Sequence, residues 1–166
     1  MRDELLFSRD GSIQAYIEQL LNAVTTSVEA ALYRLNNPAL AQGLERAWRR
    51  GVQVRLVLDR NKFDDDRAPR HLLAEVSFPW RLLYGRGGCG SKMHHKMVLF
   101  DSAVALAGSY NWTLESEREN YENLLVLRAP EQLAQFHREF EALWNEAREF
   151  RPPGDGAPGL ASRETT

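Results

Sequence analysis

Hydrophobic positions in the N-terminal part of the chain switch between helical and strand spacing. Apolar residues that recur three and four positions apart predict an amphipathic helix, and they are Ile13, Tyr16, Ile17, Leu20, Leu21 and Val24. A second helix is predicted to begin at the Asn37-Pro38 cap and to end at Gly51. Short apolar or alternating runs at residues 5–8, 28–32 and 52–58 predict strands. This βαβαβ order favours a largely parallel sheet covered by helices.

The pattern is less regular in the middle of the chain. Residues 60–67 are expected to form a charged loop, residues 70–76 a short helix and residues 81–84 a strand. A further strand is predicted at residues 123–127, and a last helix begins at Pro130 with apolar residues along one face.

These elements predict an α/β fold, with a mixed, largely parallel β-sheet flanked by helices on both faces. One domain is predicted over residues 1–150. The remaining residues, 151–166, are rich in Pro and Gly and are predicted to form a disordered tail.

Two apolar runs, residues 97–100 and 104–107, flank the turn-favouring pair Asp101-Ser102 and predict a β-hairpin. Side chains two positions apart in a strand point to the same face, about 7 Å from each other. His94 lies eight residues before position 102, and Asn111 lies nine residues after it. Antiparallel pairing should therefore bring the two outer ends of the hairpin together, within a register error of one residue.

The outer ends of this hairpin carry side chains that suit a phosphate. An imidazole and an ammonium come from His94 and Lys96, and a hydroxyl and an amide come from Ser109 and Asn111. Together they offer several hydrogen-bond donors and one nitrogen that titrates near neutral pH. We expect all four to converge on one ligand. Asp101 closes the first strand with the opposite parity from His94, and we expect it to be structural and paired with a nearby basic group.

Composition limits the classes of function. A chain of 166 residues with 43% hydrophobic content is long enough for one well-packed domain. The net charge of −2 and the pI near 6.1 argue against an overall basic coat for nucleic acid. A local basic strip remains, because residues 81–100 contain Arg81, Arg86, Lys92 and Lys96 and no acidic residue.

A glycine-rich loop at residues 85–92 lies within this basic strip. Its Lys and Ser stand in the wrong order for a P-loop, and a strand follows it where a P-loop needs a helix. We expect a flexible loop from which Arg86 and Lys92 reach backbone phosphates. Cys89 is the sole cysteine, so no intrachain disulfide is possible. The chain has no run of 18 apolar residues and no start typical of a signal peptide, which favours a cytoplasmic location.

One motif in the hairpin resembles the signature of the phospholipase D superfamily at all six of its specified positions. The motif reads His94-x-Lys96-x4-Asp101-x6-Gly108-Ser109-x-Asn111. Short bacterial nucleases of this superfamily have similar residues where this chain has Trp112-Thr113, Glu122-Asn123 and the run from Tyr33 to Pro38. The resemblance covers roughly residues 4–147. In size the chain resembles the branch with a single motif, which contains bacterial endonucleases and mitochondrial relatives that cleave cardiolipin or process small RNAs.

The resemblance implies a phosphodiesterase that needs neither metal nor cofactor and works through a covalent phosphohistidine. It implies that His94 is the nucleophile or the acid, and that Lys96 and Asn111 hold the phosphate. Because the chain has a single His-x-Lys pair, the resemblance also implies a homodimer in which His94 of each copy faces one phosphate. The zinc motif of some relatives is absent, since no Cys/His cluster has zinc spacing.

Four residues leave alternatives open. Ser109 is expected to hydrogen-bond near the phosphate, although Gly108-Ser109 would also relax a crowded backbone. Glu122 is either the carboxylate that orients the catalytic imidazole or a solvated acid in an acidic loop. Trp112 either stacks on a base or lipid of the substrate or fills the core. His95 is expected on the other strand face, packed or hydrogen-bonded.

Three functions fit these observations. The leading hypothesis is a nuclease that acts on DNA or RNA, because a basic strip accompanies the expected site. The runner-up is a phospholipase D that acts on phosphatidyl lipids, which would favour an apolar docking surface near the site. The third is a phosphate-binding module without catalysis, although binding alone does not require a nucleophile beside a cation.

Overall fold

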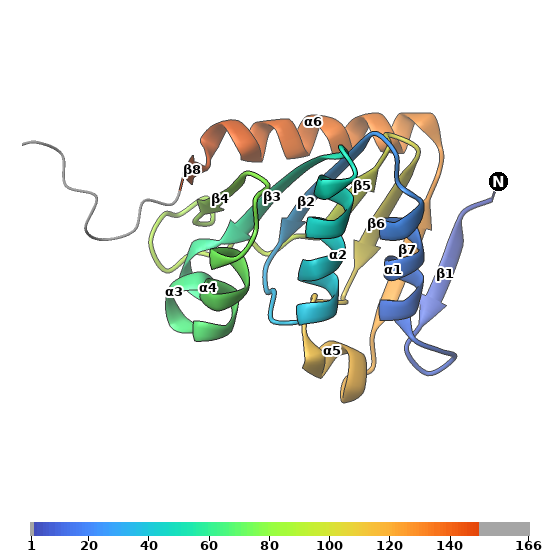
Figure 1. Ribbon diagram of the computed structural model, residues 1–166, viewed down its shortest axis with the longest axis horizontal. Coiled ribbons are helices and arrows are strands. Elements are labelled where there is room, and N and C mark those ends of the chain that lie inside the picture. Colours follow the sequence, from blue (N-terminus) through green and yellow to red (C-terminus); the bar gives the residue numbers. More distant parts are fainter. Residues whose placement is uncertain (1, 150–166) are drawn as a thin grey trace, which may run out of the picture.

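The strands of the described chain, residues 2–149, form one mixed sheet in this computed structural model (Figure 1). The order across the sheet is β1-β7-β6-β5-β2-β3-β4-β8. The bounds of the strands are β1 (Glu4–Phe7), β2 (Ser27–Leu32), β3 (Gln53–Asp59), β4 (Trp80–Leu83), β5 (Lys96–Phe100), β6 (Val104–Gly108), β7 (Asn123–Leu127) and β8 (Arg148–Glu149). The predicted tail at residues 151–166 lies outside the described residues.

Helices cover both faces of this sheet. They are α1 (Ile13–Ala23), α2 (Pro38–Arg49), α3 (Arg60–Asp65), α4 (Arg67–Ala74), α5 (Leu114–Arg118) and α6 (Pro130–Glu146). Helices α1 and α2 lie side by side on one face, and the long helix α6 crosses the other face (Figure 1). Within residues 2–149 no helix has both the length and the apolar character needed to cross a membrane.

The expected fold class, α/β with one mixed sheet and helices on both faces, is confirmed. The parallel part is smaller than expected, because only β2, β3 and β4 pair in parallel. The other pairings are antiparallel, since β5, β6 and β7 follow one another as a meander and β1 and β8 close the two edges. The βαβαβ pattern thus correctly describes one half of the sheet, and the hairpin extends it with antiparallel strands.

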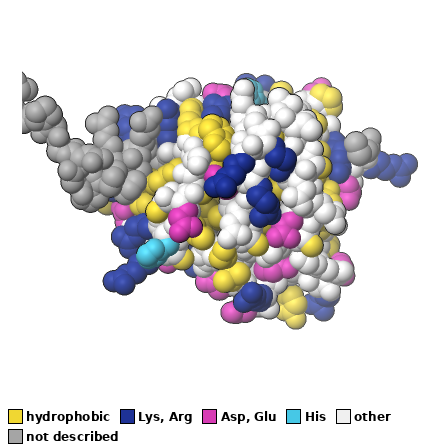
Figure 2. Space-filling view, viewed as in Figure 1, with side chains coloured by type: hydrophobic (Ala, Val, Ile, Leu, Met, Phe, Trp, Pro, Cys, Tyr) yellow, Lys and Arg dark blue, Asp and Glu magenta, His cyan; other side chains and the backbone are white. Residues whose placement is uncertain are grey.

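Side-chain caps explain where the first helices begin. The Ser12 hydroxyl accepts a hydrogen bond from the Ala15 N–H group (3.0 Å) at the start of α1. The Asn37 side chain accepts one from the Ala39 N–H group (3.0 Å), with Pro38 in the first turn of α2. On the face that these two helices cover, acidic and basic side chains are interspersed (Figure 2).

The segment expected to be a charged loop, residues 60–67, is instead mostly helical. Helix α3 forms because the Asp59 carboxylate caps it and accepts a hydrogen bond from the Lys62 N–H group (2.9 Å). Phe63 is buried on its inner face, and Arg60 pairs with Asp64 on its outer face (2.7 Å). The short elements α5 and β8 were also not predicted, because neither is long enough to show a periodic pattern.

An ion-pair network fixes α6 to the sheet. Arg55 of β3 donates hydrogen bonds to buried Glu29 of β2 (2.7 Å) and to Glu141 of α6 (2.5 Å), and the Nδ1 atom of His137 lies 2.9 Å from Glu29. Ligand atoms of Glu29, His137 and Glu141 lie within 4.8 Å of one another, as a metal site requires. The Arg55 guanidinium already neutralises both carboxylates, so we interpret the cluster as an anchor for α6.

The hairpin has the predicted register. Met97 pairs with Ala107 and Phe100 with Val104, so the ladder is symmetric about position 102. Asp101 and Ser102 both adopt a φ of 51° in the turn. The Asp101 carboxylate accepts hydrogen bonds from the backbone N–H groups of Thr25, Thr26 and Ser27. The expected basic partner of Asp101 was therefore wrong, because backbone groups occupy its oxygens.

These backbone hydrogen bonds make Asp101 a stabilising residue at neutral pH. Burial opposes its ionisation, but the N–H groups that it accepts from hold the pKa of Asp101 below its ordinary value. We predict that Asp101→Asn lowers the free energy of unfolding at pH 7 by about 1 to 3 kcal/mol. A carboxylate whose pKa is depressed in the folded state loses its contribution to stability as the pH falls. The difference in free energy of unfolding between the wild type and Asp101→Asn should therefore shrink below pH 3.8.

Urea denaturation at several pH values measures this difference. Asp10→Asn is the control, because Asp10 also lies in a turn, is exposed to solvent, and its carboxylate makes no hydrogen bond or ion pair within residues 2–149. An equal loss of stability in both variants would contradict the role assigned to Asp101.

Candidate active site

The ends of several strands meet at one end of the sheet. Leu32, the last residue of β2, pairs with Lys96, the first residue of β5. The backbone continues this ladder, since the Tyr33 N–H group donates to the His95 carbonyl oxygen (2.8 Å). Strand β6 ends and β7 begins beside them. Open α/β sheets bind ligands at the carboxyl ends of parallel strands where the strand order changes, and β2 and β3 end here.

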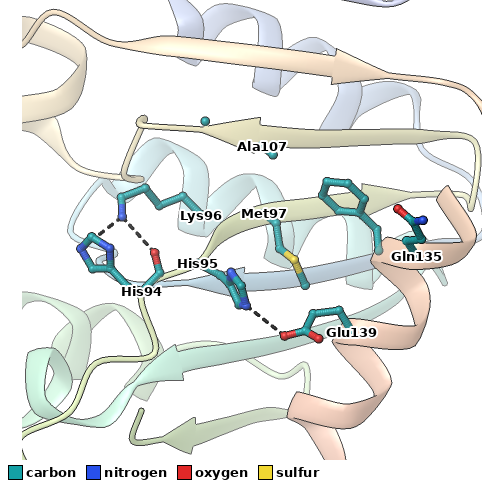
Figure 3. Close-up of a pocket in the computed structure, with 9 residues that line it drawn as sticks. His94, His95, Lys96, Met97, Ala107, Gln135 and Glu139 are labelled. Carbon is teal, nitrogen blue, oxygen red and sulfur yellow. Dashed lines mark hydrogen bonds and ion pairs between the residues drawn. The ribbon is translucent and has the colours of Figure 1, made fainter. Parts of the chain in front are cut away.

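His94 and Lys96 lie next to each other at the start of β5 (Figure 3). The Nζ atom of Lys96 is 3.5 Å from His94 Nε2 and 3.1 Å from the His94 carbonyl oxygen. The ring of Tyr33 meets the imidazole edge-on, with 4.3 Å between the ring centroids. His94 is exposed, so a ligand can reach its ring from solvent. The spacing of two residues has the predicted effect of putting both side chains at one place.

The surroundings of His94 favour its neutral form. Partial burial lowers the pKa of the imidazole below its ordinary value of 6.5, and the positive charges of Lys96 and Lys92 act in the same direction. The negative charge of Asp59 opposes them with a smaller effect. The ring is therefore neutral at pH 7, and a neutral imidazole has a lone pair for nucleophilic attack.

Glu122 is a buried acid, only 8% exposed, beside this pair. Its carboxylate accepts hydrogen bonds from Ser109 Oγ and Ser116 Oγ, the second at 2.8 Å. The interpretation of Glu122 as a solvated acid is therefore wrong, and within residues 2–149 it makes no hydrogen bond to His94. Its charge acts on Lys96 instead: burial lowers the pKa of Lys96, and the negative charge of Glu122 works in the opposite direction.

Ser109 links β6 to β7. Its hydroxyl donates to Glu122 and accepts a hydrogen bond from the Asn123 N–H group (3.0 Å). The preceding Gly108 is required by close packing, because a Cβ atom there would overlap the Asn123 carbonyl group. The structure thus favours the crowded-backbone interpretation of Gly108-Ser109, with Ser109 holding the acid in place.

Asn111 lies two residues after Ser109, where the chain leaves the sheet. Its Oδ1 atom is buried and has no hydrogen-bond partner within the described chain. A buried amide without a partner costs free energy, and such groups call for a functional explanation. A phosphate oxygen accepts hydrogen bonds, so the expected role in phosphate binding falls to the Nδ2 group of Asn111 and not to this oxygen.

Two residues of the predicted site lie elsewhere. Trp112 is 2% exposed and packs in the core, and its carbonyl oxygen accepts from the Asn36 and Asn37 N–H groups (3.0 and 3.1 Å). Of the two alternatives for Trp112, the structure supports filling of the core and excludes stacking on substrate, because the chain turns inward after Asn111. Asp101 lies at the opposite end of β5 and has no place in the site.

Two adjoining hollows open beside His94. One, of about 360 Å³, has an apolar wall that includes Met97, Ala107 and Phe136. The other, of about 440 Å³, includes Arg86 and Lys92, so the structure brings two of the three predicted substrate-binding residues beside His94. His95 borders both hollows, where its Nε2 atom lies 3.0 Å from Glu139 of α6 (Figure 3). His95 is hydrogen-bonded on the other side of the strand from His94, as predicted.

Sequence reasoning missed three residues of this site: Tyr33, Asp59 and Lys62. Tyr33 follows β2 and Asp59 ends β3, so the ends of the two parallel strands carried the signal that would have found them. Lys62 was missed because its segment was expected to be a loop, and a loop prediction does not indicate where a side chain points.

A sequence profile of the family described as "Cardiolipin synthase, PLD-like domain" matches residues 16–144. The match covers most of the chain. The chain belongs to the phospholipase D superfamily.

Curated relatives within this superfamily include mitochondrial cardiolipin hydrolases. The protein of Mus musculus is 30% identical over 137 residues, which are 82% of this chain and 60% of the relative. The protein of Danio rerio is 31% identical over 133 residues, which are 80% of this chain and 57% of the relative. The chain spans about 60% of the length of these relatives.

Solved structures share the fold of this phospholipase D-like chain. Nuc from Salmonella typhimurium, described as a phospholipase D family member, has a TM-score of 0.81 at 24% identity, over 91% of this chain and 99% of its own. NucT from Helicobacter pylori has a TM-score of 0.81 at 19% identity, over 90% and 99%. At these identities the likeness is one of fold.

The positive charge of Lys92 is predicted to contribute to the lowered pKa of His94, after burial and Lys96. Lys92→Gln removes one of the charges that lower the pKa of His94, so that pKa should rise. A histidine-edited NMR titration measures it directly. The same titration of the wild-type chain is the reference. An unchanged or lower pKa of His94 in the variant would contradict the electrostatic account.

Proposed function

We propose that this phospholipase D-like chain is a metal-independent phosphodiesterase, and that it hydrolyses nucleic acids. The observation that carries the proposal is the contact of His94 with Lys96, whose Nζ atom lies 3.5 Å from the His94 Nε2 atom. Such a pair combines a nucleophile with a cation that neutralises phosphoryl oxygens. Membership of the superfamily supports the reaction class.

The proposed reaction has two displacements at phosphorus. In the first, a ring nitrogen of His94 attacks phosphorus, a P–N bond forms and the P–O bond to the leaving group breaks. The leaving alkoxide takes a proton from an acid. In the second, water gives up a proton to the same group and attacks phosphorus, and the P–N bond breaks to release the phosphate monoester. Lys96 and the Asn111 amide hold the phosphoryl oxygens throughout.

We propose that the acid in this scheme comes from a second chain. At the described site the remaining histidine, His95, is turned toward Glu139 rather than toward His94. Two copies related by a two-fold axis would place one His94 on each side of a phosphate, and one copy would act as nucleophile and the other as acid and base. The proposed active form is therefore a homodimer with a shared site.

The charges around the site support nucleic acid as the substrate. Lys62, Lys92 and Arg86 lie near His94 in addition to Lys96. A nucleic acid carries one phosphate per nucleotide, and it binds such groups through several cations at once.

Lipid is a second candidate substrate, supported by an apolar surface and by the names of the curated relatives. Leu5 and Leu125 are exposed and are cross-strand partners in β1 and β7, and Leu125 pairs in turn with Ala107 of the apolar hollow. Phe7 is exposed beside them. This row leads from the edge of the sheet to the hollow beside His94, and an acyl chain would suit it.

One assay separates the candidate functions. The purified chain is incubated with EDTA and labelled single-stranded DNA, duplex DNA, RNA or phosphatidyl lipid vesicles. We expect cleavage of nucleic acid that EDTA does not reduce and that His94→Ala lowers by at least about 1,000-fold, because the nucleophile is gone. Trapping of a phosphorylated chain in acid would identify the covalent intermediate.

Each other result has a clear meaning. Cleavage of lipid vesicles alone would favour the second candidate. Loss of activity in EDTA would contradict the metal-independent mechanism. Binding of all phosphodiesters without turnover would indicate the phosphate-binding module.

The shared site makes a separate prediction. Heterodimers that contain one wild-type chain and one His94→Ala chain, purified with two different affinity tags, should have less than about 1% of wild-type activity, because one of the two proton-transfer or nucleophile roles is missing. Heterodimers of wild type with the surface variant His71→Ala are the control and should be fully active. Full activity in the His94→Ala heterodimer would overturn the shared site.

A further inference from the structure

All lysines of the chain gather around one aromatic ring. The sequence contains Lys62, Lys92 and Lys96 and no other lysine, and every other member of its 21 Lys and Arg residues is an arginine. The Nζ atoms of these three lie 6.0, 6.0 and 5.0 Å from the centroid of the Tyr33 ring. The His94 imidazole is the fourth group on that ring, at 4.3 Å. Lys96 is the partner of His94 in the proposed reaction, and Lys62 and Lys92 have no role in that reaction.

A buried carboxylate holds both of these additional lysines in place. Asp59 is fully buried, and one of its oxygens accepts from the Lys62 N–H group (2.9 Å). Its other oxygen accepts from the N–H group of Met93, the residue between Lys92 and His94 (2.7 Å). A single side chain thus ties the first turn of α3 to the segment that carries Lys92 and the nucleophile.

A second tie reinforces this arrangement. The Asn61 side chain donates to the Ser91 carbonyl oxygen (2.7 Å) and accepts from the Gly90 N–H group (3.3 Å). The glycine-rich loop is also closed on itself, because the Gly85 N–H group donates to the Ser91 carbonyl oxygen (3.0 Å). Lys92 is therefore presented by a hydrogen-bonded loop that is fixed to α3.

Three ammonium groups held around one point repel one another. Since each lies within 6.0 Å of the ring centroid, no two are more than twice that distance apart. The face of Tyr33 offsets part of the repulsion, and Asp65 pairs with Lys62 at 3.5 Å from a side chain that is 67% exposed. A solvated acid of this kind is easily displaced by a ligand with more charge. The cluster therefore suits an anion larger than one phosphate.

We propose that Lys62 and Lys92, set against the ring of Tyr33, form a second phosphate-binding subsite beside the phosphodiester held at His94 and Lys96. The substrate class that fits both subsites has two phosphates in close succession, as in a nucleic-acid strand, where consecutive phosphates are separated by roughly 3.4 Å along the axis. Compact ammonium groups act here as point charges, which need no fixed orientation of the phosphate. The inference rests on the proposed function for the identity of the first subsite.

Binding tests the second subsite without requiring turnover. Calorimetric titration of the full chain compares a nucleoside 3′,5′-bisphosphate with the corresponding 5′-monophosphate. We expect the wild type to prefer the bisphosphate, and Lys62→Gln to reduce that preference by about 10-fold, as loss of one charge-assisted contact implies. Lys62→Arg should retain most of it. Arg70→Gln, which removes an exposed charge from α4, is the matched control and should keep the full preference.

Two outcomes would overturn the subsite. One is a wild type that binds the bisphosphate no more tightly than the monophosphate. The other is a Lys62→Gln variant that loses affinity equally for both ligands while its melting temperature is unchanged. A chain that prefers the bisphosphate and cleaves no nucleic acid would refute the proposed function and leave the subsite standing. Binding of the wild type and of Lys62→Gln is then compared on vesicles of diphosphatidylglycerol, which has two phosphates, and of phosphatidylglycerol, which has one. This comparison distinguishes a lipid from a nucleic acid as the source of the second phosphate. A Lys62-dependent preference confined to vesicles would reject the nucleic-acid strand as its source.

Discussion

The antiparallel register between β2 and β5 is the constraint on which the rest of the site depends. Leu32 pairs with Lys96, and the hydrogen bond from Tyr33 to the His95 carbonyl extends the pairing by one step. A parallel insertion of β5 would put its first residue at the other end of the sheet from the carboxyl ends of β2 and β3. The reversal instead brings the His-x-Lys pair to the place where Tyr33 and Asp59 already lie. The contacts of His94 with Lys96 and Tyr33 follow from this arrangement, in which the start of β5 lies beside the ends of β2 and β3.

The electrostatics of the site follow from unequal burial of opposite charges. The negative groups, Asp59 and Glu122, are buried, and their oxygens are engaged by backbone or hydroxyl donors. The positive groups are more exposed and face solvent and the imidazole. The acids therefore act mainly as supports that fix chain segments, and the cations dominate the field at His94. This division favours the neutral form of His94 and leaves the cations available to an anionic ligand.

Much of the fold was predictable from local signals, and the site was predictable where it lies in the hairpin. The position of the turn at Asp101-Ser102 fixed the register, because pairing across a short turn leaves little freedom. The charged segment after β3 was misread because its helix depends on a cap from Asp59, whose orientation is a property of the folded sheet. The position of Trp112 stayed undecided because a strand pattern does not show where the chain leaves the strand. Contacts between distant segments, such as that of Lys62 with Tyr33, have no local signature at all.

The two flanks of His94 differ in chemistry, and this difference bears on substrate class more than the His-Lys pair does. A phosphodiester has two ester arms, so one held at His94 would extend over both flanks. One flank has the lysines on Tyr33, and the other has Met97 and Phe136 in an apolar wall. A lipid with a single phosphate would satisfy the apolar flank and leave the ammonium groups of the other without an anion. A nucleic-acid strand would give the lysines a phosphate and the apolar wall a sugar or base. On the proposed two-subsite arrangement, the cationic flank is therefore the feature that favours nucleic acid over a lipid with one phosphate.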